Sequence, residues 1–487
     1  MDPGLKARNN TDSQTPLCVD LDGCLCMSDT LWDIILLLAG RSPFALFTAF
    51  LSILKGKAQL KARLAEEVDP AELTFLWNPA VISLLHENSS RERFLVTGAD
   101  ERIAREVCRR LSLFDGFIAS DGKTNLTGVR KATRLASMFG EKGFDYVGNE
   151  WTDFPVWSQA RVAYLANVSR GLATRVKRAR AANVLNYRTR RLNALFRGLR
   201  PHQWVKNLIV FVPLLTAHLI TDIAALTACL IVFAAFCMAA SAFYLFNDLL
   251  DVHADRNHTA KRKRPIAAAE LNPPTAIVAG GFLFACAFAT TATINLWTSV
   301  VLAIYVTLNL AYTVKVKQLP ILDVLSLGGL YTIRIIAGAT ATLTAVSSWL
   351  LAFSVFIFLS LGLVKRYTEL SSTKLETGAY ISRRGYRAED LGFVAMMGIS
   401  CAFSALLVFA LYINSEMAEQ IYKRPEFLWP IVPALFYGVS RIWLITLRGE
   451  LHHDPVVFVV RDPASYVLAV YIGFFLWISR DPLQIFI

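Results

Sequence analysis

The chain has 487 residues, of which 54% are hydrophobic and 18% are charged, and its formal net charge is +12. This balance is typical of a membrane protein, and the length leaves room for two or three domains. Eleven Lys and Arg residues and no acidic residue lie between Arg170 and Lys206, directly before a long apolar segment. A basic cluster in that position follows the positive-inside rule. It therefore predicts membrane lipids, with anionic headgroups, as partners and excludes nucleic acid.

Residues 16 to about 165 are predicted to form an α/β domain with a parallel sheet. Three short apolar runs, PLCVDLDG, RFLVTG and FDYVGN, end in small or polar residues, as buried parallel strands do. Helical stretches lie between these runs. Ligands of such sheets gather at the carboxyl ends of the strands. A site is expected there, because four polar residues fall at those ends: Asp20, Asp22, Thr97 and Asp153.

The segment 31–54 inside this domain is too apolar for a surface insertion. Arg41, Ser42 and Pro43 interrupt it after about ten residues, too few for either half to cross a bilayer. The segment is predicted to form a helical hairpin that lies on the membrane or docks against the membrane part. A re-entrant or spanning hairpin is the alternative. Residues 166–200 follow as a basic linker, which is expected to form a helix with a cationic face.

Nine apolar segments follow, and each approaches the roughly 20 residues that a spanning helix needs. They lie at about 205–221, 223–246, 273–295, 297–314, 321–343, 346–364, 391–413, 427–447 and 463–480. Most loop Lys and Arg residues lie in 247–272, 315–320, 365–390 and 448–462. The positive-inside rule then predicts a multi-pass protein of the inner, cytoplasmic membrane, with these loops and the N-terminal domain in the cytoplasm. The predicted fold is multi-domain, an α/β domain followed by an all-α membrane domain of about nine helices over 201–487.

Acidic residues are concentrated in the stretch FNDLLDVHADRNHTAKRKRPIAAAEL, from Phe246 onward. Asp248, Asp251 and Asp255 are spaced i, i+3 and i+7, so a continuous helix places them on one face, with Asn247 at its edge. Three stacked carboxylates repel one another unless a cation lies between them. Mg²⁺ accepts oxygen ligands and usually takes several of them from phosphates. The stretch therefore indicates a site for a magnesium-bound diphosphate.

Basic residues accompany these acids at the predicted cytoplasmic ends of the helices and, for Arg334, within an apolar helix. They are Lys206, Lys261, Arg262, Lys263, Arg264, Lys315 and Arg334. An alternative interpretation of the run 261–264 is a positive-inside anchor beside a solvated helix end. Asp323 and Arg334 lie eleven residues apart, three helical turns, and hence on one helix face. Intramembrane charges of this kind pair with an opposite charge or line a polar cavity.

The soluble domain resembles the haloacid dehalogenase (HAD) phosphohydrolase superfamily. The resemblance is carried by DLDG, a later TG, a lysine in LTGVRKATRL and the stretch GNEWTDFPVW. It implies that Asp20 is the nucleophile that forms an aspartyl-phosphate and that Asp22 is the acid/base. It implies that Thr97 and Lys131 bind the phosphoryl group. Mg²⁺ would be held by Asp20, Asp153 and the main-chain carbonyl of Asp22.

Residues 195–487 resemble the UbiA superfamily of intramembrane prenyltransferases, through NDxxDxxxD with KRxRPIA among the predicted helices. Most aromatic prenyltransferases of that superfamily carry a second motif of the DxxxD type, whereas this chain has only Asp323 there. That form, with RPxQWxKN at the start and GExHxDPVVF near the end, is similar to the decaprenyl-phosphate phosphoribosyltransferase branch. The branch implies phosphoribosyl pyrophosphate and polyprenyl phosphate as substrates.

The same resemblance implies a division of labour between the two domains. Mg²⁺ on Asp248, Asp251, Asp255 and Asp323 would neutralise the departing pyrophosphate. Asn247 and basic residues at 206, 261, 262, 264, 315 and 334 would bind phosphates. The HAD-like domain would then remove the 5-phosphate, giving polyprenylphosphoryl ribose, a pentose donor for cell-envelope glycans such as arabinan.

Two other functions stay open. The first is a UbiA-type transferase that uses a prenyl diphosphate donor and an aromatic or other acceptor. The second is a lipid or substrate carrier with an inactive HAD-like scaffold. Asn149 favours inactivity, because many HAD members have a metal-binding aspartate at that position. The sequence leaves the prenyl length and any oligomer undetermined.

Overall fold

The protein divides into two compact units that interleave along the sequence. The computed structural model describes residues 15–188, 191–372, 385–451 and 454–480. The first unit joins Met1–Leu199 with Tyr244–Ala279, and the second joins Arg200–Phe243 with Gly280–Ile487. Helix α11, Ile223–Leu250, begins in the second unit and ends in the first. The boundary predicted at 200 coincides with the first passage between the units, after Leu199, whereas the aspartate-rich stretch falls in the unit that contains the α/β domain.

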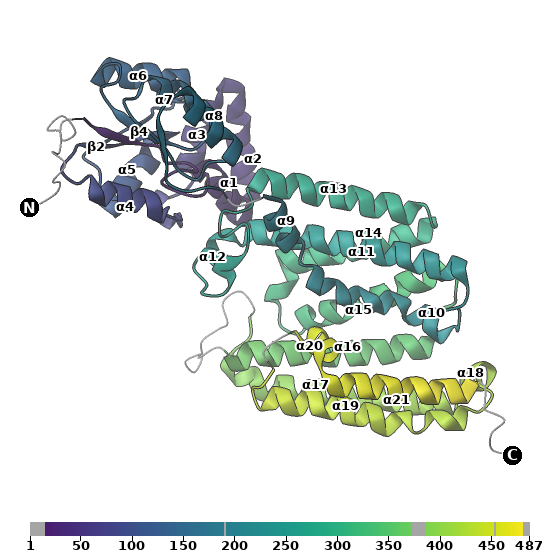
Figure 1. The fold of residues 1–487 in the computed structure, drawn as a ribbon. Coiled ribbons are helices and arrows are strands. Elements are labelled where there is room, and N and C mark those ends of the chain that lie inside the picture. The colour runs from purple at the N-terminus through teal and green to yellow at the C-terminus, as the bar shows by residue number, and fades with distance from the viewer. Residues whose placement is uncertain (1–14, 189–190, 373–384, 452–453, 481–487) are drawn as a thin grey trace, which may run out of the picture. The chain divides into compact units, whose positions relative to one another are not determined.

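The first unit contains a parallel sheet, as the sequence predicts, and the sheet has six strands rather than the three that the apolar runs indicated (Figure 1). Its strands are β1 Leu17–Val19, β2 Arg93–Asp100, β3 Gly116–Ser120, β4 Asp145–Gly148, β5 Ala163–Leu165 and β6 Ala182–Val184. Their spatial order is β3-β2-β1-β4-β5-β6, that of a doubly wound fold. The order reverses between β1 and β4. Ligands bind at such a switch point, beyond the carboxyl ends of the strands.

Helices cover both faces of the sheet. One face packs on helices α1 Thr30–Arg41, α3 Lys57–Glu66, α4 Pro79–Glu87 and α5 Glu101–Leu111. The other packs on α6 Val129–Phe139, α7 Phe154–Gln159 and α8 Arg170–Ala179. Leu17 and Val19 enter the first core and Cys18 enters the second, since successive side chains of a strand point to opposite faces. The buried sheet holds the loops after β1 and β4 in place.

The predicted basic linker, residues 166–200, is largely part of this domain. Helix α8 buries Leu172, Ala173 and Val176 while most of its basic residues stay exposed, so the cationic face is present. Strand β6 then pairs in parallel with β5, with Ala163 opposite Ala182. A three-residue strand is too short to show alternation, which explains why the sequence pattern missed it. Helix α9, Arg191–Leu199, follows.

The apolar segment 31–54 folds as a helical hairpin, in agreement with the sequence. Its first helix, α1, buries Ile34 and Leu38 in the core of the first unit. Its second helix, α2 Pro43–Leu51, begins with a proline, which suits the first turn of a helix. The side chains of Phe44 and Phe47 on α2 are 76% and 63% exposed. An exposed apolar surface of this kind marks a contact with a partner or a membrane.

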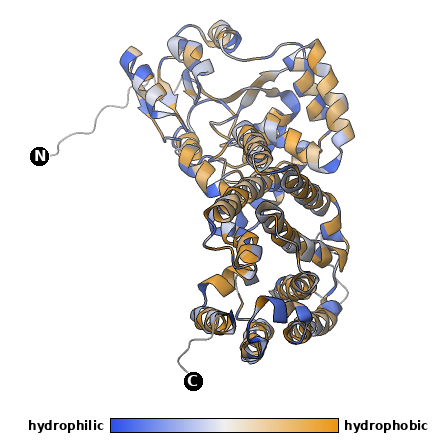
Figure 2. Ribbon diagram, turned by 90° about the vertical axis from the view of Figure 1, so that its right-hand side faces the viewer, coloured by the Kyte–Doolittle hydropathy of each residue, from blue (hydrophilic) through white to orange (hydrophobic). Residues whose placement is uncertain are grey.

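The second unit is helical. Within the described residues, eight helices are long and apolar enough to cross a membrane, where the sequence predicted nine. They are α11, α13 Pro273–Ala292, α14 Leu296–Val314, α15 Leu322–Thr342, α16 Ser348–Ser372, α17 Leu391–Ile413, α19 Ile431–Leu447 and α21 Pro463–Arg480. Figure 2 shows hydrophobic residues along these helices. Shorter helices of this unit are α10 Val212–Thr216, α18 Glu416–Ile421 and α20 Pro455–Arg461, whereas α12 Val252–Arg256 belongs to the first unit.

The first predicted spanning segment, 205–221, is not one α-helix. A 3₁₀-helix, Pro201–Phe211, runs directly into α10. A 3₁₀-helix rises about 2.0 Å per residue and an α-helix about 1.5 Å, so the pair covers about 30 Å, the thickness of a hydrocarbon core. Gly338 of α15 lets this segment approach closely, because a Cβ there would lie 1.9 Å from the Val210 carbonyl oxygen.

Candidate active sites

The ends of β1 and β4 bring together a lysine and two carboxylates that the sequence assigned to a phosphatase. Asp20 follows β1, and Lys131 reaches it from α6 with its Nζ 2.9 Å from Asp20 Oδ1. The same Nζ lies 3.9 Å from Asp153 Oδ1. Thr97 lies in β2, where the register with β3 shifts, and its hydroxyl accepts a hydrogen bond from the Ala99 N–H at 3.0 Å. Asp20, Lys131, Asp153 and Thr97 are all buried.

The protonation of Asp20 is set by its burial. Burial raises the pKa of the Asp20 carboxyl from its usual 3.8 to about 7, Lys131 opposes this rise and Asp153 adds to it. Burial lowers the pKa of Lys131, but the Asp20 and Asp153 carboxylates outweigh that effect and raise it above its ordinary value. A lysine that stays charged beside a carboxylate whose pKa is near neutrality is suited to stabilising negative charge on a bound phosphoryl group.

Tyr146 completes this cluster, and the sequence analysis missed it. Its hydroxyl accepts a hydrogen bond from Lys131 Nζ and donates one to Asp153 Oδ1, both at 2.9 Å. Asp153 Oδ2 accepts the N–H groups of Asn149 and Glu150 at 2.9 and 3.1 Å. No spacing rule links Tyr146 to Asp153. Only the polar atom on an otherwise buried strand hinted at a role.

The predicted magnesium ligands of this domain are only partly suited to a metal. Both oxygens of Asp153 already accept hydrogen bonds. Asn149 Nδ2 is buried and has no acceptor among the described residues, at the position where the resemblance expects a carboxylate. Across the residues placed by the structure, no three His, Cys, Asp or Glu side chains form a group that would hold a metal ion. Asp20 and Asp153 alone therefore do not make a complete site.

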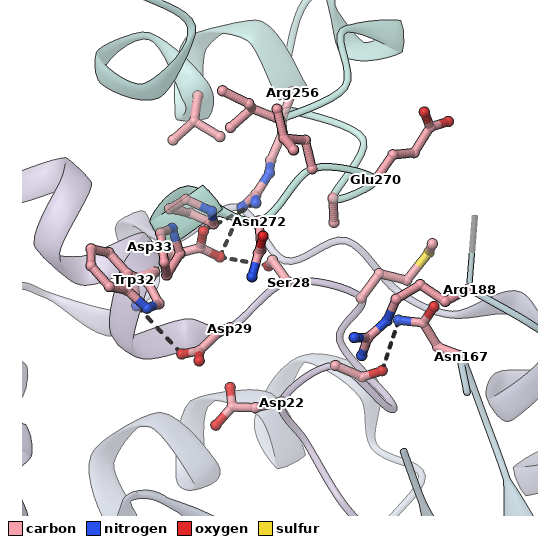
Figure 3. Close-up of a pocket in the computed structure, with 18 of the residues that line it drawn as sticks. Asp22, Ser28, Asp29, Trp32, Asp33, Asn167, Arg188, Arg256, Glu270 and Asn272 are labelled. Carbon is pink, nitrogen blue, oxygen red and sulfur yellow. Dashed lines mark hydrogen bonds and ion pairs between the residues drawn. The ribbon is translucent and has the colours of Figure 1, made fainter. Parts of the chain in front are cut away.

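Asp22 lies where the β1 loop meets a polar pocket. Its Oδ1 accepts the N–H and the hydroxyl of Thr30 at 2.8 and 2.7 Å, so its carboxylate is fixed at the start of α1. Gly23 follows with φ of 70°, and a Cβ there would lie 2.2 Å from Asn149 Nδ2. Glycine is thus required for the turn that presents Asp22. The pocket, of about 220 Å³, also has a wall from residues 252–274 (Figure 3).

The aspartate-rich stretch contains its own cation. Arg264 Nη1 lies 3.2 Å from Asp248 Oδ1 and 2.6 Å from Asp255 Oδ2. Asp248 and Asp255 are buried, whereas Asp251 is half-buried. The helix is interrupted at Asp251, but its N–H still bonds to the Asn247 carbonyl at 2.9 Å, as in an α-helix. The sequence predicted a metal cation between the stacked carboxylates. In the structure, the Arg264 guanidinium lies between Asp248 and Asp255.

The chemistry of this stretch nevertheless fits a hard divalent cation. Its candidate ligands are all oxygen atoms, as Mg²⁺ prefers. The buried Oδ1 of Asn247 accepts no hydrogen bond from the described part of the chain, so an oxygen ligand is available beside Asp248. Lys261 and Arg262 are exposed in the 3₁₀-turn Lys261–Lys263. Binding a metal at Asp248 and Asp255 requires Arg264 to release them.

In the second unit, Asp323 and Arg334 bind different partners, although both lie on α15 as the sequence predicts. Asp323 Oδ2 lies 2.5 Å from the Arg366 guanidinium, both side chains are fully buried, and the Tyr386 hydroxyl donates to Asp323 Oδ1 at 2.8 Å. Arg334 instead donates to Asn207 Oδ1 at 2.7 Å and to the Tyr305 hydroxyl at 3.1 Å. Helix periodicity places residues on one face but does not choose their partners on other helices. A closed ion pair leaves Asp323 poorly placed to bind a metal.

Two lysines of the second unit meet at one carboxylate. Lys206 Nζ lies 2.6 Å from Asp454 Oδ2, and Lys365 Nζ lies 3.7 Å from the same oxygen. Lys206 was predicted to bind phosphate, whereas the sequence analysis did not assign Lys365 or Asp454 to a site. Lys365 and Asp454 each lie more than 150 residues from Lys206 in the sequence, so only the fold brings the three side chains together. Lys315 ends α14 and is exposed.

The chain is similar to known proteins over both of its parts. The model of the UbiA prenyltransferase family matches residues 209–413. The Uncharacterized protein y4nM of Sinorhizobium fredii is 32% identical over 467 residues, 95% of this chain and 90% of that protein. The decaprenyl-phosphate phosphoribosyltransferase of Mycolicibacterium smegmatis is 35% identical over 297 residues, 59% of this chain and 91% of that protein. A solved UbiA homolog from Archaeoglobus fulgidus, bound to GPP and Mg²⁺, aligns with 59% of this chain and 99% of its own at 15% identity and a TM-score of 0.45.

The eight apolar helices found in the described part of the chain and the matched family model define an integral, multi-pass membrane protein. The chain matches the Mycolicibacterium smegmatis protein at 35% identity over 91% of that protein's length, and it also matches the UbiA family model. The chain therefore belongs to the UbiA prenyltransferase family. The similarity to the y4nM protein extends over 95% of the chain and so takes in the α/β domain as well.

Proposed function

We propose that the chain transfers 5-phosphoribose from phosphoribosyl pyrophosphate to polyprenyl phosphate and that its α/β domain then removes the 5-phosphate. The observation that carries the transferase is the 35% identity to a decaprenyl-phosphate phosphoribosyltransferase over 91% of that relative. The product of such a transfer bears a phosphate monoester at ribose C5. That ester is a substrate for the phosphatase chemistry that Asp20, Asp22 and Lys131 favour.

In the transfer, an oxygen of the lipid phosphate bonds to ribose C1 while the C1–oxygen bond to pyrophosphate breaks. Asp248, Asp251 and Asp255 would hold Mg²⁺, which neutralises charge on the leaving pyrophosphate. Arg264 would release the carboxylates of Asp248 and Asp255 and bind phosphate oxygens instead. A guanidinium donates paired hydrogen bonds to phosphate. No protein nucleophile takes part. Asp323, in its closed pair with Arg366, positions α15 against α16.

In the dephosphorylation, a carboxylate oxygen of Asp20 attacks the phosphorus and the bond to the ribose oxygen breaks. Asp22 gives its proton to the leaving alkoxide and then takes one from the water that hydrolyses the aspartyl-phosphate. Lys131 neutralises charge on the phosphoryl oxygens, while Tyr146 holds Lys131 in place. The net products are the free sugar hydroxyl and inorganic phosphate.

The two activities are coupled by their location in one compact unit. The aspartates at 248, 251 and 255 fall in the same unit as the sheet that carries Asp20. A product released near these aspartates therefore has a short path to the phosphatase. The dephosphorylated lipid is a pentose donor for glycan synthesis at the cell envelope.

Membranes that contain the chain, incubated with polyprenyl phosphate and phosphoribosyl pyrophosphate labelled in the ribose carbons, test both steps. We expect a labelled lipid with a free 5-hydroxyl. Asp251→Asn should abolish the labelled lipid, and Asp20→Asn should leave it with its 5-phosphate. A chain that forms no labelled lipid would rule out the transferase. Free 5-hydroxyl from Asp20→Asn would rule out the phosphatase.

A further inference from the structure

The pocket beside Asp22 is built from two distant parts of the chain. On one side it is lined by the loop after β1 and the start of α1, including Asp22, Ser28 and Trp32. On the other side it is lined by residues that follow the aspartate-rich helix, including Arg256 and Asn272. Figure 3 shows Asp22 and Asn272 on opposite sides of the space, with Arg188 extending into it. The segment that follows the transferase aspartates thus forms a wall of the phosphatase site.

This wall is held in place by a buried ion pair. The two Nη atoms of Arg256 lie 2.9 and 3.0 Å from the two oxygens of Asp33, and both side chains are 4% exposed. Arg256 also donates to the Thr74 carbonyl at 2.8 Å, and Ser28 donates to Asp33 Oδ2 at 2.6 Å. Bidentate pairing of this kind fixes geometry as well as adding energy. The pocket is therefore a formed site.

The lining of the pocket suits a sugar. Its volume of about 220 Å³ is below the range of about 300–1,000 Å³ for drug-sized ligands. Asn272 Oδ1 is buried and accepts no hydrogen bond from the described residues. Buried polar atoms are nearly always hydrogen-bonded, and a hydroxyl group of a bound sugar would donate the bond that Asn272 Oδ1 lacks. Asn167 also lines the pocket, and its Nδ2 donates to the Gly23 carbonyl at 3.0 Å.

Arg188 lines the pocket, and its guanidinium extends into the space (Figure 3). One of its partners is Glu150, whose Oε1 lies 3.6 Å from Arg188 Nη2; the Glu150 side chain is 55% exposed and that of Arg188 21%. Exposed pairs of this kind are weak. A phosphate that enters the pocket competes well for the guanidinium, because charge-assisted bonds to phosphate are strong and paired.

We propose that this pocket binds the sugar of the phosphatase substrate and that Arg188 binds a second phosphate on that sugar. The inference rests on the proposed phosphatase and names its substrate class: a sugar phosphate monoester whose other end carries a phosphodiester. The monoester lies at Asp20 and Lys131, the sugar hydroxyls reach Asn272, and the diester lies at Arg188. The domain thereby selects the lipid-linked sugar over free sugar phosphates.

The test compares two soluble substrates with the full chain in detergent. One is methyl riboside 5-phosphate, and the other carries a methyl phosphodiester in place of the methyl group at C1. We expect kcat/KM for phosphate release to favour the diester by about 10- to 100-fold, the range of a charge-assisted hydrogen bond. Arg188→Gln should reduce this preference about tenfold or more. The preference is a ratio, so it does not depend on how much of the variant folds.

Arg178→Gln is the matched control, since Arg178 is an exposed arginine of α8 outside the pocket. It removes the same charge and should leave the preference unchanged. Equal kcat/KM for the two substrates, or an unchanged preference in Arg188→Gln, would overturn the inference and leave the phosphatase standing. Release of phosphate from neither substrate by the unaltered chain would overturn both.

Discussion

Breaking the ion pair between Asp33 and Arg256 should destabilise the first unit more than any exposed pair in it. Each partner is 4% exposed, and the two are joined by two hydrogen bonds. Arg256→Met leaves the Asp33 carboxylate buried with only the Ser28 hydroxyl as a side-chain donor. Removing one partner of a buried pair costs about 3 to 5 kcal/mol. That is a large share of the about 5 to 15 kcal/mol that stabilises a typical domain.

Replacing both partners by apolar residues should recover much of this loss. A well-packed apolar substitute for a buried ion pair is often neutral. We therefore expect Asp33→Leu with Arg256→Met to cost at least about 2 kcal/mol less than the sum of the single changes. Glu72→Gln breaks the pair of Glu72 with Arg41, whose side chains are 40% and 55% exposed, and should cost no more than about 1 kcal/mol.

Pulse proteolysis of the full chain in detergent, over a series of urea concentrations, measures these effects. With an m-value of about 2 kcal/mol/M, a loss of 3 to 5 kcal/mol lowers the unfolding midpoint by about 1.5 to 2.5 M urea. Glu72→Gln should shift it by about 0.5 M or less. Additive costs in the double variant would refute the argument, because they would mean that the two side chains do not stabilise each other.

Further predictions concern the site and the surface. Tyr146→Phe removes the hydroxyl between Lys131 and Asp153 and should lower phosphatase kcat about tenfold, and an unchanged rate would exclude its role in positioning Lys131. The pKa of Asp20 is raised to about 7, so the folded state keeps a proton that the unfolded state loses near pH 4. In the presence of a metal chelator, the first unit should therefore lose stability as the pH rises from about 4 to about 7. Asp20→Asn should flatten this dependence, and an equal slope in the variant would assign it to another group. A nitroxide attached through Phe47→Cys on exposed α2 should collide more often with oxygen dissolved in the bilayer than with an aqueous nickel chelate. A nitroxide attached through Arg105→Cys on α5 should collide more often with the nickel chelate. Equal behaviour at the two positions would show that α2 does not contact lipid.

Local patterns in the sequence predicted the elements of the fold better than its boundaries. Short apolar runs before Asp20 and Asn149 predicted parallel strands, and the interruption at Arg41–Pro43 predicted two helices in the hairpin. The interleaving of the units was hidden, since it depends on contacts such as Asp33 with Arg256, 223 residues apart. A 3₁₀-helix also has the composition of an α-helix, so Pro201–Phe211 could not be told apart by hydropathy.

In the candidate sites, too, local spacing was predicted correctly and long-range partners were not. The spacing of Asp20 and Asp22 predicted a place at the end of β1, and the structure brings Lys131 there. Charge partners on other elements could not be assigned from spacing. Arg264 was predicted to bind phosphate and lies between two aspartates, and Asp323 pairs with Arg366 instead of Arg334. A helical face restricts the direction of a side chain, whereas its partner depends on the whole fold.

The chain passes between the two units three times, after Leu199, Phe243 and Ala279. A fragment that stops at Leu199 contains Asp20, Asp22 and Lys131 but lacks Arg256 and Asn272. Such a fragment would expose Asp33 as an uncompensated charge and leave the pocket beside Asp22 open on one side. The α/β domain is therefore not a detachable module that a single break could release as an independent enzyme. The segment 252–274 both lines the pocket beside Asp22 and supplies the buried partner of Asp33, so a mutation there acts on the pocket and on the stability of the unit.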